Sequence, residues 1–125
     1  MAEMPCVEVL SNRLRVRIPV QSILYVSIRR NASLLHTDGG IIKTYMTFTS
    51  MKALLEQSAS CFLTCYKGCL VNMNRIAGVA GIDFVMDNGE YVQVRKRDGN
   101  RIRQSYVLYR CARTVPVQGA VIGVL

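Results

Sequence analysis

The alternation of apolar and polar positions along the chain predicts a mainly β structure. Apolar residues alternate with charged or polar ones over Cys6–Leu10 and Leu14–Ile18, with Ser11-Asn12 between them. A period of two is typical of half-buried strands, so these segments predict an antiparallel pair that Pro19 ends. Further strands are expected at Ser22–Ile28, Ser33–His36, Ile41–Thr47, Ala77–Met86 and Glu90–Val94.

Short polar segments separate these strands. Arg29-Arg30-Asn31-Ala32 forms a polar tip, Asp38-Gly39-Gly40 is a tight-turn signal, and Asp87-Asn88-Gly89 predicts a hairpin turn. Glycine and asparagine suit such turns because they tolerate a positive φ. The expected connections are therefore short, and neighbouring strands are expected to be antiparallel.

Helical spacing appears in two places. Met51, Leu54 and Leu55 predict a short helix over Met51–Ser58, with Thr49 or Ser50 as its cap. After Arg101, the residues Ile102, Tyr106 and Tyr109 recur at helical spacing and favour a closing helix. The β-branched residues of that last segment leave a strand open as the alternative.

Between the helices, Phe62–Ile76 combines buried and projecting positions. Its apolar residues predict a strand, and Tyr66-Lys67-Gly68 predicts a projecting connection. Asn72 is suited to cap a short helical turn, because its side chain can accept a hydrogen bond from a free backbone amide. The stretch is expected to anchor in the core and to present Lys67 outward.

The composition indicates one globular domain with a polyanionic partner. The chain has 125 residues, of which 50% are apolar, and a net charge of +8. No apolar run approaches the ~20 residues that span a bilayer, and the first residues do not form a signal peptide. The excess charge favours nucleic acid, an anionic membrane surface or an acidic protein as partner. The basic residues cluster at Arg13, Arg15 and Arg17, at Arg29 and Arg30, and at Arg95, Lys96, Arg97, Arg101, Arg103, Arg110 and Arg113.

The cysteines and the lone histidine point to no catalytic site. Five cysteines without a secretion signal fit reduced thiols in a cytoplasmic protein. Cys61, Cys65 and Cys69 lack the paired two-residue spacing of zinc sites and are interpreted as buried apolar residues. His36 lies in no recognisable catalytic pattern. We therefore expect no enzymatic activity, cofactor, metal or small-molecule substrate.

The ordered motifs resemble the LytTR family of DNA-binding domains, the effector modules of many bacterial response regulators. The segment Phe62–Asn72, FLTCYKGCLVN, is similar to the family pattern F-x-R-x-H-x-S-x-L-V-N. The other matching pieces are Ile23–Val26 before the polar tip, Asp38-Gly39 before a strand, the Thr49–Ser58 helix, Asn74–Ile76, Asp87-Asn88-Gly89, and Val92–Arg97, which resembles I-P-V-S-R-R. The resemblance covers roughly Leu14 to Tyr109.

This resemblance implies an elongated, mostly antiparallel β fold with one short helix, which reads double-stranded DNA through loops in successive major grooves. Family members contact DNA from the tip after the second strand, from the loop before L-V-N, and from the basic end of the last strand. Carried over position by position, these contacts fall on Arg30, Asn31 and Ala32 with the adjoining Arg29, on Tyr66, Lys67 and Gly68, and on Arg95, Lys96 and Arg97. Arg30 and Arg97 suit guanine, whereas Lys67, Arg95 and Lys96 suit phosphates.

The sequence departs from the family pattern at four of these motif positions. Ala32 replaces a polar residue, Thr64 an arginine, Tyr66 a histidine and Arg95 a serine. The operator sequence therefore cannot be transferred from the family.

Cys65 adjoins the DNA-facing loop. Lys67 is close enough in sequence to lower the pKa of an exposed thiol there, so oxidation of Cys65 that blocks DNA binding is one hypothesis. An inert thiol is the alternative.

We expect three parts: an N-terminal strand or extension over 1–13, a LytTR-like DNA-binding domain over 14–109 and an apolar C-terminal tail over 110–125. Val115–Leu125 carries no charge and is expected to be covered, as an added strand on its own sheet or on that of a second copy. A homodimer and an inhibitory or signalling protein partner are therefore both left open.

The leading functional hypothesis is a sequence-specific transcriptional regulator that binds double-stranded DNA. The alternative is a basic β module that binds RNA or a membrane protein partner without sequence-specific DNA readout. Aromatic residues make up only 7% of the chain, which disfavours an RNA-stacking sheet.

Overall fold

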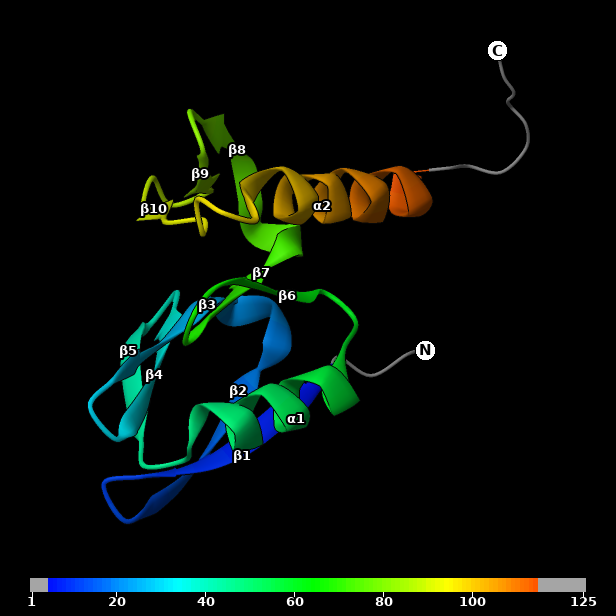
Figure 1. The fold of residues 1–125 in the computed structure, drawn as a ribbon. Helices are drawn as coiled ribbons and strands as arrows, with labels where there is room; N and C mark the ends of the chain where they lie inside the picture. The colour runs from blue at the N-terminus through cyan, green and yellow to red at the C-terminus, as the bar shows by residue number, and fades with distance from the viewer. Residues whose placement is uncertain (1–4, 115–125) are drawn as a thin grey trace.

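The computed structural model describes residues 5–114, which fold into three antiparallel sheets and two helices (Figure 1). The first sheet is a hairpin of β1 (Cys6–Ser11) and β2 (Leu14–Pro19). The central sheet has the order β5-β4-β3-β7-β6. Its strands are β3 (Ile23–Arg29), β4 (Ala32–Thr37), β5 (Gly40–Thr44), β6 (Phe62–Tyr66) and β7 (Cys69–Asn72). The mainly antiparallel β class with a short helix and a C-terminal helix is confirmed.

The remaining elements are a third sheet, two helices and two 3-10 turns. The third sheet has the order β10-β9-β8, with β8 (Ile76–Ala80), β9 (Asp83–Met86) and β10 (Tyr91–Val92). The helices are α1 (Phe48–Ser58) and α2 (Gly99–Thr114), and two 3-10 turns cover Val20–Ser22 and Met73–Arg75. Figure 1 shows α1 and the β1–β2 hairpin on one side of the central sheet, and α2 with β8–β10 on the other.

Two hydrophobic cores flank the central sheet. One contains Val7 and Val9 of β1 with Met51 and Leu55 of α1, and the other contains Phe84 of β9 with Ile102 and Tyr106 of α2. Successive residues of a strand point to opposite faces, so β3, β6 and β7 supply both cores, whereas β4 and β5 supply only the first. The strand pairs show this plainly, because Val26 faces Leu70 in the first core and Tyr25 faces Val71 at the second.

Strand β7 is buried at all four positions because it lies between these two cores. The fully buried side chain of Asn72 ends the strand, and its amide nitrogen donates to the Ile23 carbonyl at 2.8 Å. Its amide oxygen accepts from the backbone N–H of Asn74 at 3.0 Å. The predicted cap on a short helical turn is therefore confirmed. The same residue also ties that turn to β3, so its polar groups are satisfied although buried.

The strand predictions after residue 40 need three corrections. The strand expected at Ile41–Thr47 ends at Thr44, where the Thr44 hydroxyl donates to the Leu10 carbonyl at 2.8 Å. The strand expected over Ala77–Met86 is two strands, since Gly81 adopts a φ of +64° and reverses the chain. The strand expected over Glu90–Val94 is only Tyr91–Val92, because the Val94 amide bonds the Asp83 carboxylate.

Both helices begin earlier than their spacing indicates. Helix α1 starts at Phe48 and is capped by Thr47, not by Thr49 or Ser50. The Thr47 hydroxyl accepts from the Ser50 amide at 3.1 Å, and Phe48 packs against the first core, so the helix gains a turn. Helix α2 is confirmed as a helix but starts at Gly99, where the Asp98 carbonyl accepts from the Ile102 amide. The expected fate of the Val115–Leu125 tail lies outside the described residues.

Arg75 links the central sheet to the third sheet. Its guanidinium forms salt bridges at 2.8 Å with Asp38 in the β4–β5 turn and at 2.7 Å with Asp87 in the β9–β10 turn, and it donates to the Gln21 carbonyl at 2.8 Å. The hydrogen bonds that Arg75 donates to Asp87 and then to Asp38 raise the pKa of Arg75, and its bond to Asp38 lowers the pKa of that carboxyl. Asp38 and Asp87 are 49 residues apart in the sequence. One arginine side chain therefore holds together two turns that are distant along the chain.

Candidate nucleic-acid interface

The β3–β4 turn carries the first predicted group of DNA-binding residues. Arg29 ends β3 and pairs with Ala32, which leaves Arg30 and Asn31 as a two-residue turn. Arg29, Arg30 and Asn31 are exposed, whereas Ala32 is buried with 1% relative exposure. The position carried over to Ala32 is therefore corrected, because its side chain faces the interior and cannot reach a ligand at this turn.

Arg30 adopts a left-handed backbone conformation with φ of +59°. This region costs an L-residue roughly 1–2 kcal/mol, and glycine is the preferred residue where a two-residue turn requires it. Strain of this kind is concentrated at functional positions. The arginine is thus held at the turn at a cost in stability.

The β6–β7 turn carries the second group. Tyr66 pairs with Cys69 and leaves Lys67-Gly68 as the turn. A Cβ atom at Gly68 would lie 3.4 Å from Cβ and Cγ1 of Ile28, and the φ of Gly68 is +76°. Glycine therefore allows the turn both to bend and to lie against β3, while Tyr66 and Lys67 remain exposed.

The third group follows β10 and is attached to the second. The backbone N–H of Arg95 donates to the Cys65 carbonyl at 2.7 Å, at the end of β6. Arg95, Lys96 and Arg97 are all exposed. The Arg95 guanidinium lies 3.7 Å from the Asp98 carboxylate, whereas Lys96 and Arg97 form no salt bridge within residues 5–114. Their charges are therefore available to an external anion.

Strand register brings the three groups to one end of the central sheet. Strands β3 and β7 are antiparallel, with Ser27 opposite Cys69, so the C-terminal end of β3 adjoins the N-terminal end of β7. The first and second turns therefore project from the same end, and the bond between Arg95 and Cys65 adds the third segment beside them. Residues that are far apart in the sequence form one exposed basic surface.

A groove of about 530 Å³ adjoins this surface. Tyr66, Lys67 and Arg95 line it, together with Lys52 of α1 and Arg101 of α2. Neither Lys52 nor Arg101 is among the site residues that the sequence predicts. Lys52 gave no signal at all, because a lysine between apolar helical positions looks like an ordinary solvent-exposed side chain. Arg101 belonged to the basic cluster of the last third, but only its place in the fold connects it to the β6–β7 turn.

Thr64 also lines the groove, where the family pattern has an arginine. Its Oγ1 atom is buried and has no hydrogen-bond partner within the described part of the chain. Position 64 therefore supplies no charge here, and the cations that line the groove come from other elements.

The structure contradicts the premise of the redox hypothesis for Cys65. The thiol is completely buried rather than exposed, and it donates a weak hydrogen bond to the Cys69 carbonyl, with 3.9 Å between sulfur and oxygen. The interaction with Cys69 and then burial raise the pKa of Cys65. A protonated, inaccessible thiol is a poor nucleophile, so Cys65 packs as an apolar residue.

The fold and this surface define a class of protein: a rigid antiparallel β scaffold that presents cationic loops at one end, as nucleic-acid-binding domains do. A LytTr DNA-binding domain model matches residues 14–106. The chain therefore belongs to the LytTR family of DNA-binding domains, which is a non-catalytic family.

A solved structure agrees with this assignment at the level of the fold. It is the LytTr DNA-binding domain of a Bacillus cereus protein described as a methyl-accepting/DNA response regulator. It is 20% identical, has a TM-score of 0.59, and the match covers 88% of this chain and 96% of that one. Among curated proteins no relative matches this chain. Within residues 5–114, no helix is long and apolar enough to cross a membrane.

Proposed function

We propose that this domain is a sequence-specific transcriptional regulator that reads duplex DNA in major grooves through three loops. The observation that carries the proposal is the gathering of the β3–β4 turn, the β6–β7 turn and the segment after β10 at one end of a rigid sheet. A major groove about 12 Å wide admits long side chains from such loops. A rigid scaffold also reduces the ordering that binding would otherwise require.

The side chains fall into two chemical roles. Arg30 and Arg97 are exposed and form no salt bridge within residues 5–114, so their planar guanidinium groups are free to donate two hydrogen bonds to guanine. Lys67 and Lys96 are point charges that suit phosphate oxygens. Arg95 is already 3.7 Å from Asp98, which favours a positioning role on the backbone over base reading.

A random duplex library selected with the purified domain tests the proposal. We expect one enriched motif with two conserved blocks, because loops spaced along one end of the sheet reach separate stretches of groove. The variant Arg30→Ala,Arg97→Ala should bind the library without enrichment, while Arg15→Ala,Arg17→Ala, which removes the same charge from β2, should select the wild-type motif. A selection by the wild-type domain that enriches no sequence would contradict sequence-specific reading.

A further inference from the structure

The β1–β2 turn is a second place where an arginine lies in a left-handed conformation. Ser11 pairs with Leu14, and the two turn residues Asn12 and Arg13 have φ of +54° and +67°. Positive φ at both central residues is the signature of a type I′ turn, which favours Asn-Gly. Asn12 fits this preference, but Arg13 stands where glycine is preferred, as Arg30 does in the β3–β4 turn.

Hydrogen bonds place this turn at the same end of the molecule as the β3–β4 turn. Ser33 is opposite Thr44 in the β4–β5 pair, so Thr44 lies at the end of β5 that adjoins the β3–β4 turn. The Thr44 hydroxyl donates to the Leu10 carbonyl at 2.8 Å, three residues before Arg13. At about 3.4 Å per residue, the tip of the hairpin extends beyond this anchor by roughly 10 Å.

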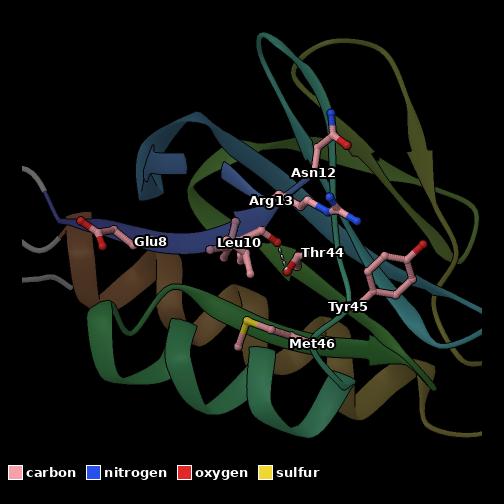
Figure 2. Close-up of a pocket in the computed structure, with 8 residues that line it drawn as sticks. Glu8, Leu10, Asn12, Arg13, Thr44, Tyr45 and Met46 are labelled. Atoms are coloured by element: carbon pink, nitrogen blue, oxygen red, sulfur yellow. Dashed lines mark hydrogen bonds between the residues drawn. The ribbon is translucent and has the colours of Figure 1, made fainter. Parts of the chain in front are cut away.

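A groove of about 670 Å³ separates the β1–β2 turn from the segment that follows β5. Figure 2 shows Asn12 and Arg13 at the end of the hairpin where Tyr45 lies, with Met46 over α1, whereas Glu8 lies at the other end of the strand. Tyr45 is 69% exposed, and the Lys43 ammonium lies 5.0 Å from the centre of its ring. Arg13 therefore lines the groove on the hairpin side, and Lys43 adjoins the groove through its contact with Tyr45.

The positive charge around this groove favours an anionic partner. Arg13 and Lys43 form no salt bridge within residues 5–114, and Glu8 is already paired with Arg15 at 3.5 Å. Strand register relates these cations: Lys43 is opposite Leu34, two positions along β4 from the Arg29–Ala32 pair that closes the β3–β4 turn. The next residue, Thr44, bonds Leu10 of the hairpin that carries Arg13. A duplex that occupies the loops of the proposed interface would meet these charges if it continued past the β3–β4 turn.

We propose that Arg13 contacts a backbone phosphate of DNA that flanks the sequence-specific site, so that the β1–β2 turn forms a fourth contact. This inference rests on the proposed function, because it requires that the three loops place duplex DNA at this end of the sheet. The contact adds affinity without base selectivity, as phosphate contacts do. The flanking duplex thus lies at the edge of the groove, and the contact of Arg13 lengthens the stretch of DNA that the domain covers.

Duplexes of two lengths and two matched variants test the contact. The core duplex contains only the selected motif, and the long duplex adds about one helical turn of arbitrary sequence on each side. Arg13→Gly creates the favoured Asn-Gly turn, so the hairpin keeps or gains stability when the charge is removed. Arg17→Thr removes an equal charge from β2 of the same hairpin and serves as the control. Affinities are measured by fluorescence anisotropy over a series of salt concentrations.

We expect the wild-type domain to bind the long duplex more tightly than the core duplex. Arg13→Gly should lower affinity for the long duplex by about 3–10-fold and reduce the magnitude of its salt slope by about 1, and it should leave the core duplex unchanged. Arg17→Thr should match the wild type on both.

Equal wild-type affinity for both duplexes, or equal losses in the two variants, would overturn the Arg13 contact. No binding of the core duplex by the wild-type domain would instead contradict the proposed function itself. Thermal melting of each variant separates loss of folding from loss of contact.

Discussion

Arg30 has a strained backbone conformation and is also a proposed DNA contact. Its φ of +59° is unfavourable for a side chain with a Cβ atom, and no salt bridge within the described residues holds its guanidinium. At a position that served only to turn the chain, glycine or asparagine would be the more stable choice. An arginine in this conformation indicates a trade-off between stability and binding, which predicts opposite effects of one substitution on the two properties.

Replacing Arg30 with glycine should weaken DNA binding without weakening the fold. Removal of left-handed strain gains roughly 1–2 kcal/mol, and the greater freedom of glycine in the unfolded chain offsets about 0.5–1 kcal/mol of that. We therefore expect the free energy of unfolding, from urea titration, to stay level or rise by up to ~1 kcal/mol. Affinity for the selected duplex should fall by about tenfold or more as a base contact is lost. Unchanged affinity would exclude Arg30 from the interface.

Substitutions of Arg97 and Lys67 should affect DNA binding in different ways, one through base selectivity and the other through overall affinity. Arg97→Ala should cost about 1–3 kcal/mol of binding free energy and relax selectivity at one base position. Lys67→Ala should weaken all duplexes alike and lower the magnitude of the salt slope by about 1. The measurement is affinity against every single-base variant of the selected motif. Equal and non-selective losses from both substitutions would show that Arg97 does not read a base.

At the scale of elements, Arg75 fastens the central and third sheets through two turns and one carbonyl. A lysine has the charge but not the planar fork that reaches Asp38, Asp87 and Gln21 together. Arg75→Lys should therefore lower the free energy of unfolding by about 1–3 kcal/mol, as expected when hydrogen bonds to charged groups are lost. Arg17→Lys, on the exposed face of β2, is the control and should leave stability unchanged in urea unfolding. Equal stability of both variants would contradict a linking role.

The same group of charges should make stability depend on pH in acid. The bond from Arg75 holds the pKa of Asp38 below its usual value of 3.8 in the folded state. The unfolded state therefore binds the proton more readily, so the stabilisation is present above pH 3.8 and is lost as pH falls through the lower folded pKa. The advantage of the wild type over Asp38→Asn, measured by urea unfolding from pH 6 to pH 2.5, should shrink below about pH 3.8. A constant difference over that range would contradict the pairing.

At the scale of the whole molecule, the basic surface predicts steep salt dependence. Sixteen Lys and Arg against eight Asp and Glu give the chain a charge of +8, and three exposed loops concentrate part of it at one end. If about five phosphates are neutralised, the logarithm of affinity should fall with the logarithm of salt concentration at a slope near −4 to −5. Anisotropy titrations between about 50 and 300 mM salt measure it. A slope shallower than about −2 would mean that the loops do not share one duplex.

Local features of the fold were predictable because they depend on neighbouring residues. The β1–β2 pair follows from alternation, and the β9–β10 turn from Asp87-Asn88-Gly89, whose glycine has a φ of +93°. The Asn72 cap and the helical class of α2 follow from side-chain chemistry and spacing within a few residues. The turn at Gly81 was missed because one glycine in an apolar run does not by itself show that the chain reverses.

The assembly of the site was decided by tertiary structure. By itself, the sequence determined which segments are strands or turns and that three of them carry cations, since backbone preference and charge are local properties. The pairing of Ser27 with Cys69 and the bond from Arg95 to Cys65 join residues that are 42 and 30 positions apart. Lys52 lines the groove with Arg101, which is 49 positions further along the chain. No local pattern encodes such contacts. The burial of Ala32 and Cys65 has the same origin. Each lies near an exposed turn in sequence, but Cys65 packs in the second core and Ala32 is buried at the start of β4, so neither side chain reaches the surface.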